Sequence, residues 1–198
     1  MDSRIARIRR KPARVPYAAT RSHSFGEEGH GFRLGPPVPQ ARAAAFEAEH
    51  RIELPAPYRA FLTALGGAGA SPFYGLLPLR SCRLFTMDPR LGPGRPRGFT
   101  AVGAAPPRGD LFLHVIEAGC GDLVLLGVTG PPAGRVVTGN ADGFRGPDVS
   151  SAADFLAWYE RRLDHLLDGR DNRGLELTSP ALRAPLRLSG RGLSEGCG

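Results

Sequence analysis

The stretch from Glu53 to Leu79, ELPAPYRAFLTALGGAGASPFYGLLPL, constrains the fold of this chain more than any other stretch does. Pro55 and Pro57 favour the first turn of a helix, where a missing N–H group costs nothing. The apolar residues after them recur at i, i+3, i+4 and i+7, the spacing of one helix face: Tyr58, Phe61, Leu62 and Leu65. We therefore expect a helix that buries one side in the core of a domain.

Glycine ends this helix and shapes the segment after it. Gly66-Gly67 is expected to stop the helix at a position that requires a left-handed residue, and Gly69 leaves the next turn unconstrained. An apolar run from Phe73 to Leu77 then returns to the core. The stretch contains no reactive group but a glycine-lined rim, which favours a binding role over a catalytic one.

The length and composition of the chain indicate one domain with tails. A chain of 198 residues has room for one sizeable core. No apolar run approaches the ~20 residues of a membrane span, and no apolar stretch follows the basic N-terminus as in a secretory signal. The odd number and wide spacing of Cys82, Cys120 and Cys197 predict neither a disulfide framework nor a metal site. We expect a protein of the reducing cytoplasm.

The net charge of +7 is concentrated near the N-terminus. Residues 1–14 hold six basic side chains and one acidic side chain, a net +5. Ile5 and Ile8 are the apolar anchors here, Pro12 interrupts the segment, and so short a helix is marginal in isolation. We expect residues 1–16 to form a basic disordered arm that is dispensable for folding. The alternative left open is an arm that contacts nucleic acid.

The remaining pattern predicts an α+β domain over residues 17–169. Residues 40–50 are expected to form an alanine-rich helix, and residues 150–168 a helix capped at Ser151, with Trp158 at the edge of its apolar face. Three β-rich runs between residues 111 and 137, LFLHVIE, LVLLGV and RVV, are separated by turn residues, so a mostly antiparallel sheet is the simplest topology. Residues 80–110 show only one apolar patch, and residues 170–198 are expected to be a flexible tail.

Four motifs taken in order resemble the SUKH superfamily of fungal cell-wall-assembly regulators and bacterial immunity proteins. They are LPAPYRAFLTALGGAG, PFYGLLPL, IEAGCGDLVLLGVTGPPAGRVV and SSAADFLAWYERRLDHLL, within about residues 25–168. The FGEEGHGFRLGPP segment is similar to an extension of some bacterial members. One departure is Val137-Thr138-Gly139, where many members carry a tryptophan or an acidic residue after the equivalent strand.

The resemblance implies an α+β fold with helices packed on a mostly antiparallel sheet. It also implies a non-enzymatic intracellular protein-binding module, either an immunity protein that neutralises a toxin domain or a regulatory adaptor. Exposed aromatic and charged groups supply most binding energy in such modules. The candidates beside the glycine-rich breaks are Phe73, Tyr74, Asp122 and Arg135, with Arg135 expected on the same side as Asp122.

A small hydrolase is the second interpretation left open. Cys120 stands between two glycines in a strand-to-strand turn, and Asp110, Glu117 and Asp122 cluster around one strand and its turn. No phosphate loop, nucleophile elbow or zinc-protease motif accompanies them. His23 and His30 have a spacing that fits no metal-ligand set, so we expect no metal and no cofactor.

Overall fold

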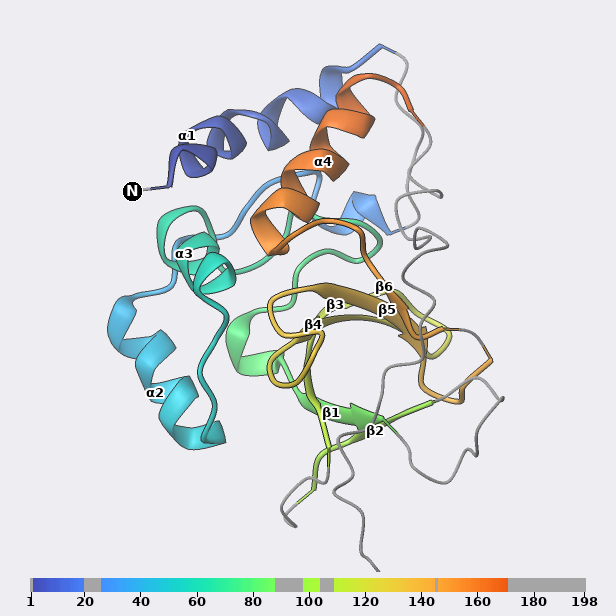
Figure 1. The fold of residues 1–198 in the computed structure, drawn as a ribbon. Helices are drawn as coiled ribbons and strands as arrows, with labels where there is room; N and C mark the ends of the chain where they lie inside the picture. The colour runs from blue at the N-terminus through green and yellow to red at the C-terminus, as the bar shows by residue number, and fades with distance from the viewer. Residues whose placement is uncertain (1, 20–25, 88–97, 104–108, 145, 171–198) are drawn as a thin grey trace, which may run out of the picture.

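The computed structural model describes residues 2–19, 26–87, 98–103, 109–144 and 146–170, and it shows an α+β domain (Figure 1). Its α-helices are α1 (Ser3–Arg10), α2 (Gln40–His50), α3 (Ala56–Ala64) and α4 (Phe155–Leu167). Short 3₁₀ helices are η1 (Pro12–Tyr17), η2 (Glu27–Gly29) and η3 (Leu79–Ser81). The strands are β1 (Leu84–Met87), β2 (Phe99–Ala101), β3 (Leu111–Glu117), β4 (Asp122–Gly127), β5 (Val136–Asn140) and β6 (Asp148–Val149). The expected tail after Arg170, which includes Cys197, lies outside the described residues.

All six strands form one antiparallel sheet in the order β2-β1-β3-β4-β5-β6. The central pairing joins β3, β4 and β5, as the turn-rich breaks in the sequence predicted. A register shift between His114 and Ile116 marks a bulge in β3. Because of this bulge, the consecutive residues Val115 and Ile116 both belong to the core under the helices.

The sheet is buried on both faces because it curls (Figure 1). Along β4 the side chains alternate: Val124 and Leu126 join the core under the helices, while Leu123 and Leu125 join a second cluster inside the curl. This explains why the strand reads as a continuous apolar run. The second cluster is closed by Phe99, whose ring would lie 2.5 Å from a Cβ atom added at Gly139. The absence of a side chain at Gly139 therefore leaves room for Phe99.

Aromatic rings join α3 to α4. The Phe155 ring meets the Tyr58 and Phe61 rings edge-on, at centroid distances of 4.7 and 5.2 Å. Phe61 also meets the Tyr159 ring at 4.7 Å, and the Tyr159 hydroxyl donates to the Ala70 carbonyl. The helix over residues 56–64 and its buried face confirm the central prediction from the sequence.

The expectation that Gly66 and Gly67 end helix α3 in a left-handed conformation was wrong. Neither residue has a positive φ, whereas Gly69 does, at 88°. Both glycines are needed because the segment around residues 35–38 lies directly on them. A Cβ atom at Gly66 would fall 2.6 Å from the Gly35 carbonyl oxygen, and one at Gly67 would fall 2.5 Å from Val38 Cγ2. Close backbone approach, and not a left-handed helix end, selects glycine here.

Helix α4 begins later than the sequence suggested. Asp154 and not Ser151 is the N-cap, and its Oδ1 accepts a hydrogen bond of 2.8 Å from the Ala157 N–H group. Trp158, expected at the edge of the apolar face, is buried.

The segment of residues 80–110 also holds more structure than expected, because β1 and β2 lie in it. Strands of four and three residues are too short to show a periodic pattern in the sequence.

The expectation of a disordered N-terminal arm was wrong. Asp2 caps helix α1 by accepting from the Arg4 N–H group at 2.9 Å, and both Ile5 and Ile8 are completely buried. Val15, in η1, is buried in the same core. Tertiary packing of one apolar face supplies the stability that so short a helix lacks alone.

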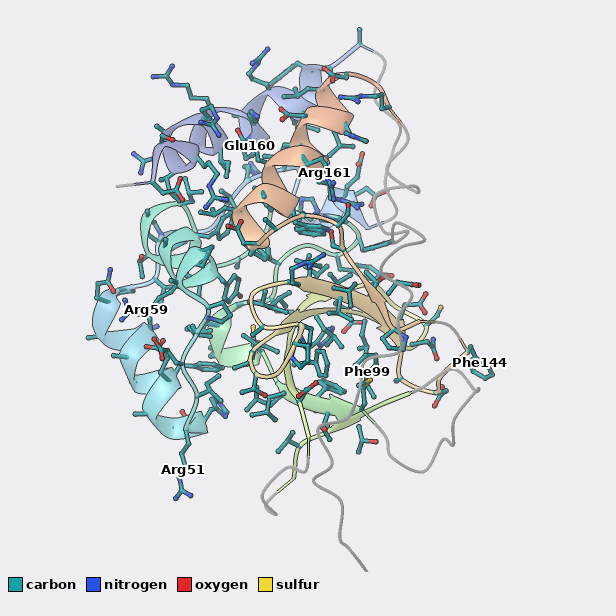
Figure 2. All side chains as sticks on the ribbon, viewed as in Figure 1. Arg51, Arg59, Phe99, Phe144, Glu160 and Arg161 are labelled. Atoms are coloured by element: carbon teal, nitrogen blue, oxygen red, sulfur yellow. The ribbon has the colours of Figure 1, made fainter. Side chains whose placement is uncertain are left out.

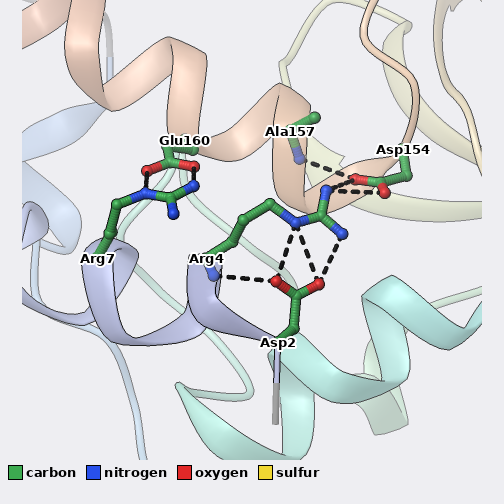
Figure 3. Close-up of polar contacts among 6 residues, drawn as sticks. All are labelled: Asp2, Arg4, Arg7, Asp154, Ala157 and Glu160. Atoms are coloured by element: carbon green, nitrogen blue, oxygen red, sulfur yellow. Dashed lines mark hydrogen bonds and ion pairs between the residues drawn. The ribbon is translucent and has the colours of Figure 1, made fainter.

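Ion pairs fix α1 along α4, as Figure 3 shows for the first two. The Arg4 guanidinium lies between Asp2 and Asp154, with its Nη1 2.8 Å from both Asp154 oxygens. Arg7 makes two parallel hydrogen bonds of 2.9 Å to Glu160. Lys11 Nζ contacts Glu160 at 2.9 Å and Asp164 at 2.6 Å. The acidic partners lie about 150 positions away in the sequence, so no local pattern reveals them.

We expect Phe61→Ala and Phe155→Ala each to lower the free energy of unfolding by about 3–5 kcal/mol, because each leaves a cavity between α3 and α4. Urea or guanidinium melts would measure the loss. A loss below about 1 kcal/mol for both variants would contradict the placement of these rings in the core.

We expect Ile8→Ala to lower the free energy of unfolding by about 2–5 kcal/mol, because Ile8 is fully buried between α1 and the rest of the core. The same denaturant melts apply. Arg10→Ala is the matched control: this exposed residue of α1 forms no ion pair in the described part of the chain, and the midpoint should hardly move. Equal, small effects of both substitutions would mean that α1 does not belong to the folded domain.

Candidate partner-binding surface

The turn between β3 and β4 has an unusual backbone. Gly119, Cys120 and Gly121 all have positive φ, at 79°, 52° and 74°. The Asp122 N–H group closes the turn on the Gly119 carbonyl at 2.9 Å. Positive φ at both central residues is typical of the tight turns that match the twist of a hairpin. The exposed side chain of Cys120 is held in a conformation that few non-glycine residues adopt.

The loop after β5 lies beside this turn. Asn140, the last residue of β5, donates from Nδ2 to Asp122 Oδ1 at 2.9 Å. The Ala141 N–H group donates to the Gly121 carbonyl at 2.8 Å, and Asn140 Oδ1 accepts from the Asp142 N–H group at 2.9 Å. The turn and the loop therefore form one connected surface at this end of the sheet.

Tyr74 reaches the same surface from the segment after α3. Its N–H group donates to the Glu117 carbonyl at 3.3 Å. Its ring passes over two glycines: Cβ atoms added at Gly26 and Gly119 would lie 2.9 and 3.3 Å from ring carbons. Because these glycines have no side chains, the ring lies close to their backbone, and 50% of the residue stays exposed.

We call the surface made by Tyr74, Glu117, Cys120, Asp122, Asp142 and Phe144 the hairpin rim. Phe144, in the loop after β5, is 81% exposed and points away from the body of the domain (Figure 2). The large hydrophobic residues exposed in the described chain are Tyr17, Tyr74 and Phe144, so two of these three lie on the rim. Three carboxylates, those of Glu117, Asp122 and Asp142, border the turn and the loop, so the surface carries both aromatic and acidic side chains.

The four residues chosen from the sequence separate into different places. Tyr74 and Asp122 lie on the hairpin rim. Phe73 has a φ of 55° and packs against the core, with the Arg162 guanidinium 5.8 Å from its ring centroid. Arg135 precedes β5 at the opposite end of the β4–β5 ladder, roughly 17 Å from Asp122 along the strand, and donates to the Ser150 carbonyl. The expectation that Arg135 shares a side with Asp122 was wrong.

The structure separates Asp110 from the other candidate residues for hydrolysis. No hydrogen bond or ion pair joins the Cys120 thiol to a base within the described ranges, so nothing there activates it. Asp110 precedes β3 and Glu117 ends it, about 23 Å apart along the strand, so the expected cluster of carboxylates does not form. Burial raises the pKa of Asp110, whose carboxylate lies against Gly130. Glu117 accepts from the Gly119 N–H group at 3.0 Å, a turn-closing role.

His30 has a structural setting. Its Nδ1 accepts a hydrogen bond of 3.0 Å from the Phe32 N–H group, and the ring is buried edge-on to the Phe32 ring. His23, the other histidine of this segment, lies outside the described residues. The part of the chain that the structure describes contains no group of three or more His, Cys, Asp or Glu side chains placed to hold a metal ion.

Half of the cations in the basic N-terminal segment are paired with carboxylates. Arg4, Arg7 and Lys11 are engaged by carboxylates of α4, and Arg9 donates to the Ala64 carbonyl at the end of α3 at 2.9 Å. Carboxylates thus pair three of the six basic side chains that the sequence places in residues 1–14. An electrostatic footprint on a phosphate backbone requires unpaired cations.

Comparison of the chain with protein-family models, with curated proteins and with solved structures finds no match in any of the three. The SUKH resemblance therefore stays a prediction from the quoted motifs. Among the described helices, none combines the length and the apolar character needed to cross a membrane.

Sequence reasoning missed Asp142 and Phe144. Both lie in the turn-rich segment ADGFRGPD, which has no period that could show which side chains face outward. An aromatic residue next to a glycine, between a strand and a short edge strand, was the available signal. Its exposure follows only from the structure.

We expect the protein to lose stability as the pH falls below about 6.5. Burial lowers the pKa of both His30 and His114 from the usual 6.5, although Glu27 and Glu117 respectively oppose the shift. The unfolded chain therefore binds more protons than the folded one as the pH falls through 6.5, and acid favours unfolding. His114→Gln should reduce the slope of the unfolding free energy between pH 7.5 and 5, measured by urea melts. An unchanged slope would contradict this assignment.

Proposed function

We propose that this protein is a non-enzymatic protein-binding module that recognises its partner through the hairpin rim. The observation that carries the proposal is the exposed Tyr74 ring at the β3–β4 turn, with Asp122 on the turn, Asp142 on the loop bonded to it, and the exposed Phe144 two residues further along that loop. Interface hot spots are rich in aromatic side chains that are surrounded by polar groups. A rigid hairpin turn under such residues also limits the entropy lost on binding.

The proposed partner is a protein, and which protein it is depends on which of two roles this chain has. The SUKH resemblance supports two roles: an immunity protein that binds and neutralises a cognate toxin domain, and a regulatory adaptor. The carboxylates of the rim would complement basic side chains of either partner. A toxin whose activity is blocked by this protein would favour the first role.

We place this function in the cytoplasm. Cys82 and Cys120 are free thiols, Cys82 buried and Cys120 exposed on the rim. Burial raises the pKa of the Cys82 thiol to about 12, so Cys82 stays an inert core residue. An exposed free thiol on a partner-binding surface is most compatible with a reducing compartment.

The proposal is preferred over a hydrolase and over nucleic-acid binding for separate reasons. Cys120 lacks an activating base among the described residues, and Asp110 is distant from Glu117. Arg4, Arg7 and Lys11 are held by carboxylates at α4. Hydrolytic activity lost on Cys120→Ala, or salt-dependent DNA retention lost on removing α1, would favour these alternatives.

We expect the double variant Tyr74→Ala, Phe144→Ala to lose the partner that the wild-type protein captures from extracts of its native cell, identified by mass spectrometry. Removing two aromatic anchors should weaken binding at least tenfold, since hot-spot truncations each cost about 2 kcal/mol or more. Both side chains are exposed, so the melting curve should stay nearly unchanged.

Tyr17→Ala is the matched control, because Tyr17 is 87% exposed but lies in η1 beside α4 and not on the rim. It should capture the same protein as the wild type. Retention of the partner by the folded double variant would remove the rim from the binding site. Loss of the partner in the Tyr17 variant as well would point to a different surface.

A further inference from the structure

A second surface feature lies at α2, away from the hairpin rim. It is a groove of about 560 Å³ between the extended segment Pro36–Pro39, one face of α2 and the segment Pro78–Arg80, with Gly67 and Ala68 also lining it. Ligand sites commonly measure about 300–1,000 Å³ and have mostly apolar walls. Prolines, Phe46 and Leu79 give this groove walls of that kind.

The glycines after α3 create the groove. Because Gly67 has no side chain, the Pro36–Pro39 segment lies directly over it, and the Gly67 N–H group donates to the Pro36 carbonyl at 3.0 Å. The Val38 N–H group donates to the Leu62 carbonyl at 2.8 Å. Prolines have no N–H group to satisfy, so this wall presents hydrocarbon to the groove with few polar groups.

Two unpaired cations flank the apolar walls. Arg42 and Arg80 are exposed, and neither makes an ion pair or a side-chain hydrogen bond within residues 2–19, 26–87, 98–103, 109–144 and 146–170. This differs from α1, where Arg4 and Arg7 are paired with carboxylates. Glu49 shares the α2 face with Arg42 at i+7, about 10 Å along the helix, so one carboxylate also borders the groove.

We propose that this groove binds a small amphiphilic carboxylate, a molecule with a hydrocarbon or aromatic body and one carboxylate group. The body would lie on the proline wall and on Phe46 and Leu79, and the carboxylate would be held by Arg42 and Arg80. Guanidinium–carboxylate hydrogen bonds are among the strongest that proteins make. Glu49 weakens the binding of an anion, so its removal strengthens it.

The proposal does not rest on the proposed protein-binding function. The groove shares no residue with the hairpin rim, and a ligand there needs no protein partner. Capture of a partner through the rim and binding of a carboxylate in the groove can therefore succeed or fail separately.

The test is an isothermal titration of the full-length protein at low salt with octanoate and with 1-octanol, which differ mainly in the charge of the head group. We expect octanoate to bind at least tenfold more tightly than octanol. Arg42→Gln with Arg80→Gln should remove this preference, and Glu49→Gln should tighten octanoate binding severalfold. Arg10→Gln, a change to an unpaired arginine on α1, should change neither affinity.

A second variant, Ala45→Trp, tests the groove without changing its charge. Ala45 is an exposed residue of the α2 face that lines the groove, so a tryptophan there should fill the groove and abolish octanoate binding while the protein still folds. Failure of octanoate to bind, equal affinity for octanol, or an affinity insensitive to the arginine pair or to Ala45→Trp would each overturn the proposal.

Discussion

The aromatic packing of α4 on α3 is the contact on which the rest of the structure depends. Phe155 is completely buried between Tyr58 and Phe61, and Tyr159 extends the contact to the Ala70 carbonyl just beyond α3. Helix α4 in turn holds α1 through three carboxylates and covers the sheet core (Figure 1). Removing the ring of Phe155 would therefore weaken the contact of α4 with α3, and with it the support of α1.

The hairpin rim and the groove at α2 both exist because backbone passes close to glycine. At the rim, Gly26 and Gly119 let the Tyr74 ring lie flat across the turn. At the groove, Gly67 lets the Pro36–Pro39 segment cover the end of α3. In both places the glycines bring distant segments together and leave larger side chains at the surface. Glycine- and proline-rich connections of the sequence thus shape both surfaces.

Elements with strong hydrophobic periodicity could be predicted from the sequence. Elements whose stability depends on residues far away in the chain could not. The helix around Phe61 and the strands around Leu113 and Leu125 follow from local pattern alone, and the structure confirms the α+β fold. Helix α1 could not be predicted, because Glu160 and the other acids that hold it are remote in the chain. The rim was half predicted: Tyr74 and Asp122 follow from turn chemistry, whereas the exposure of Phe144 depends on how the loop after β5 leaves the sheet.

The ion-paired contact of α1 with α4 also sets an order of events during synthesis. Ile5 and Ile8 are synthesised well before their partners on α4, which are made only after about residue 155. At about 5–20 residues per second, this leaves the N-terminal helix without its docking surface for roughly 8–30 s. Its dense positive charge, part of which the folded domain later pairs with carboxylates, would keep this apolar segment from associating with other chains in the meantime.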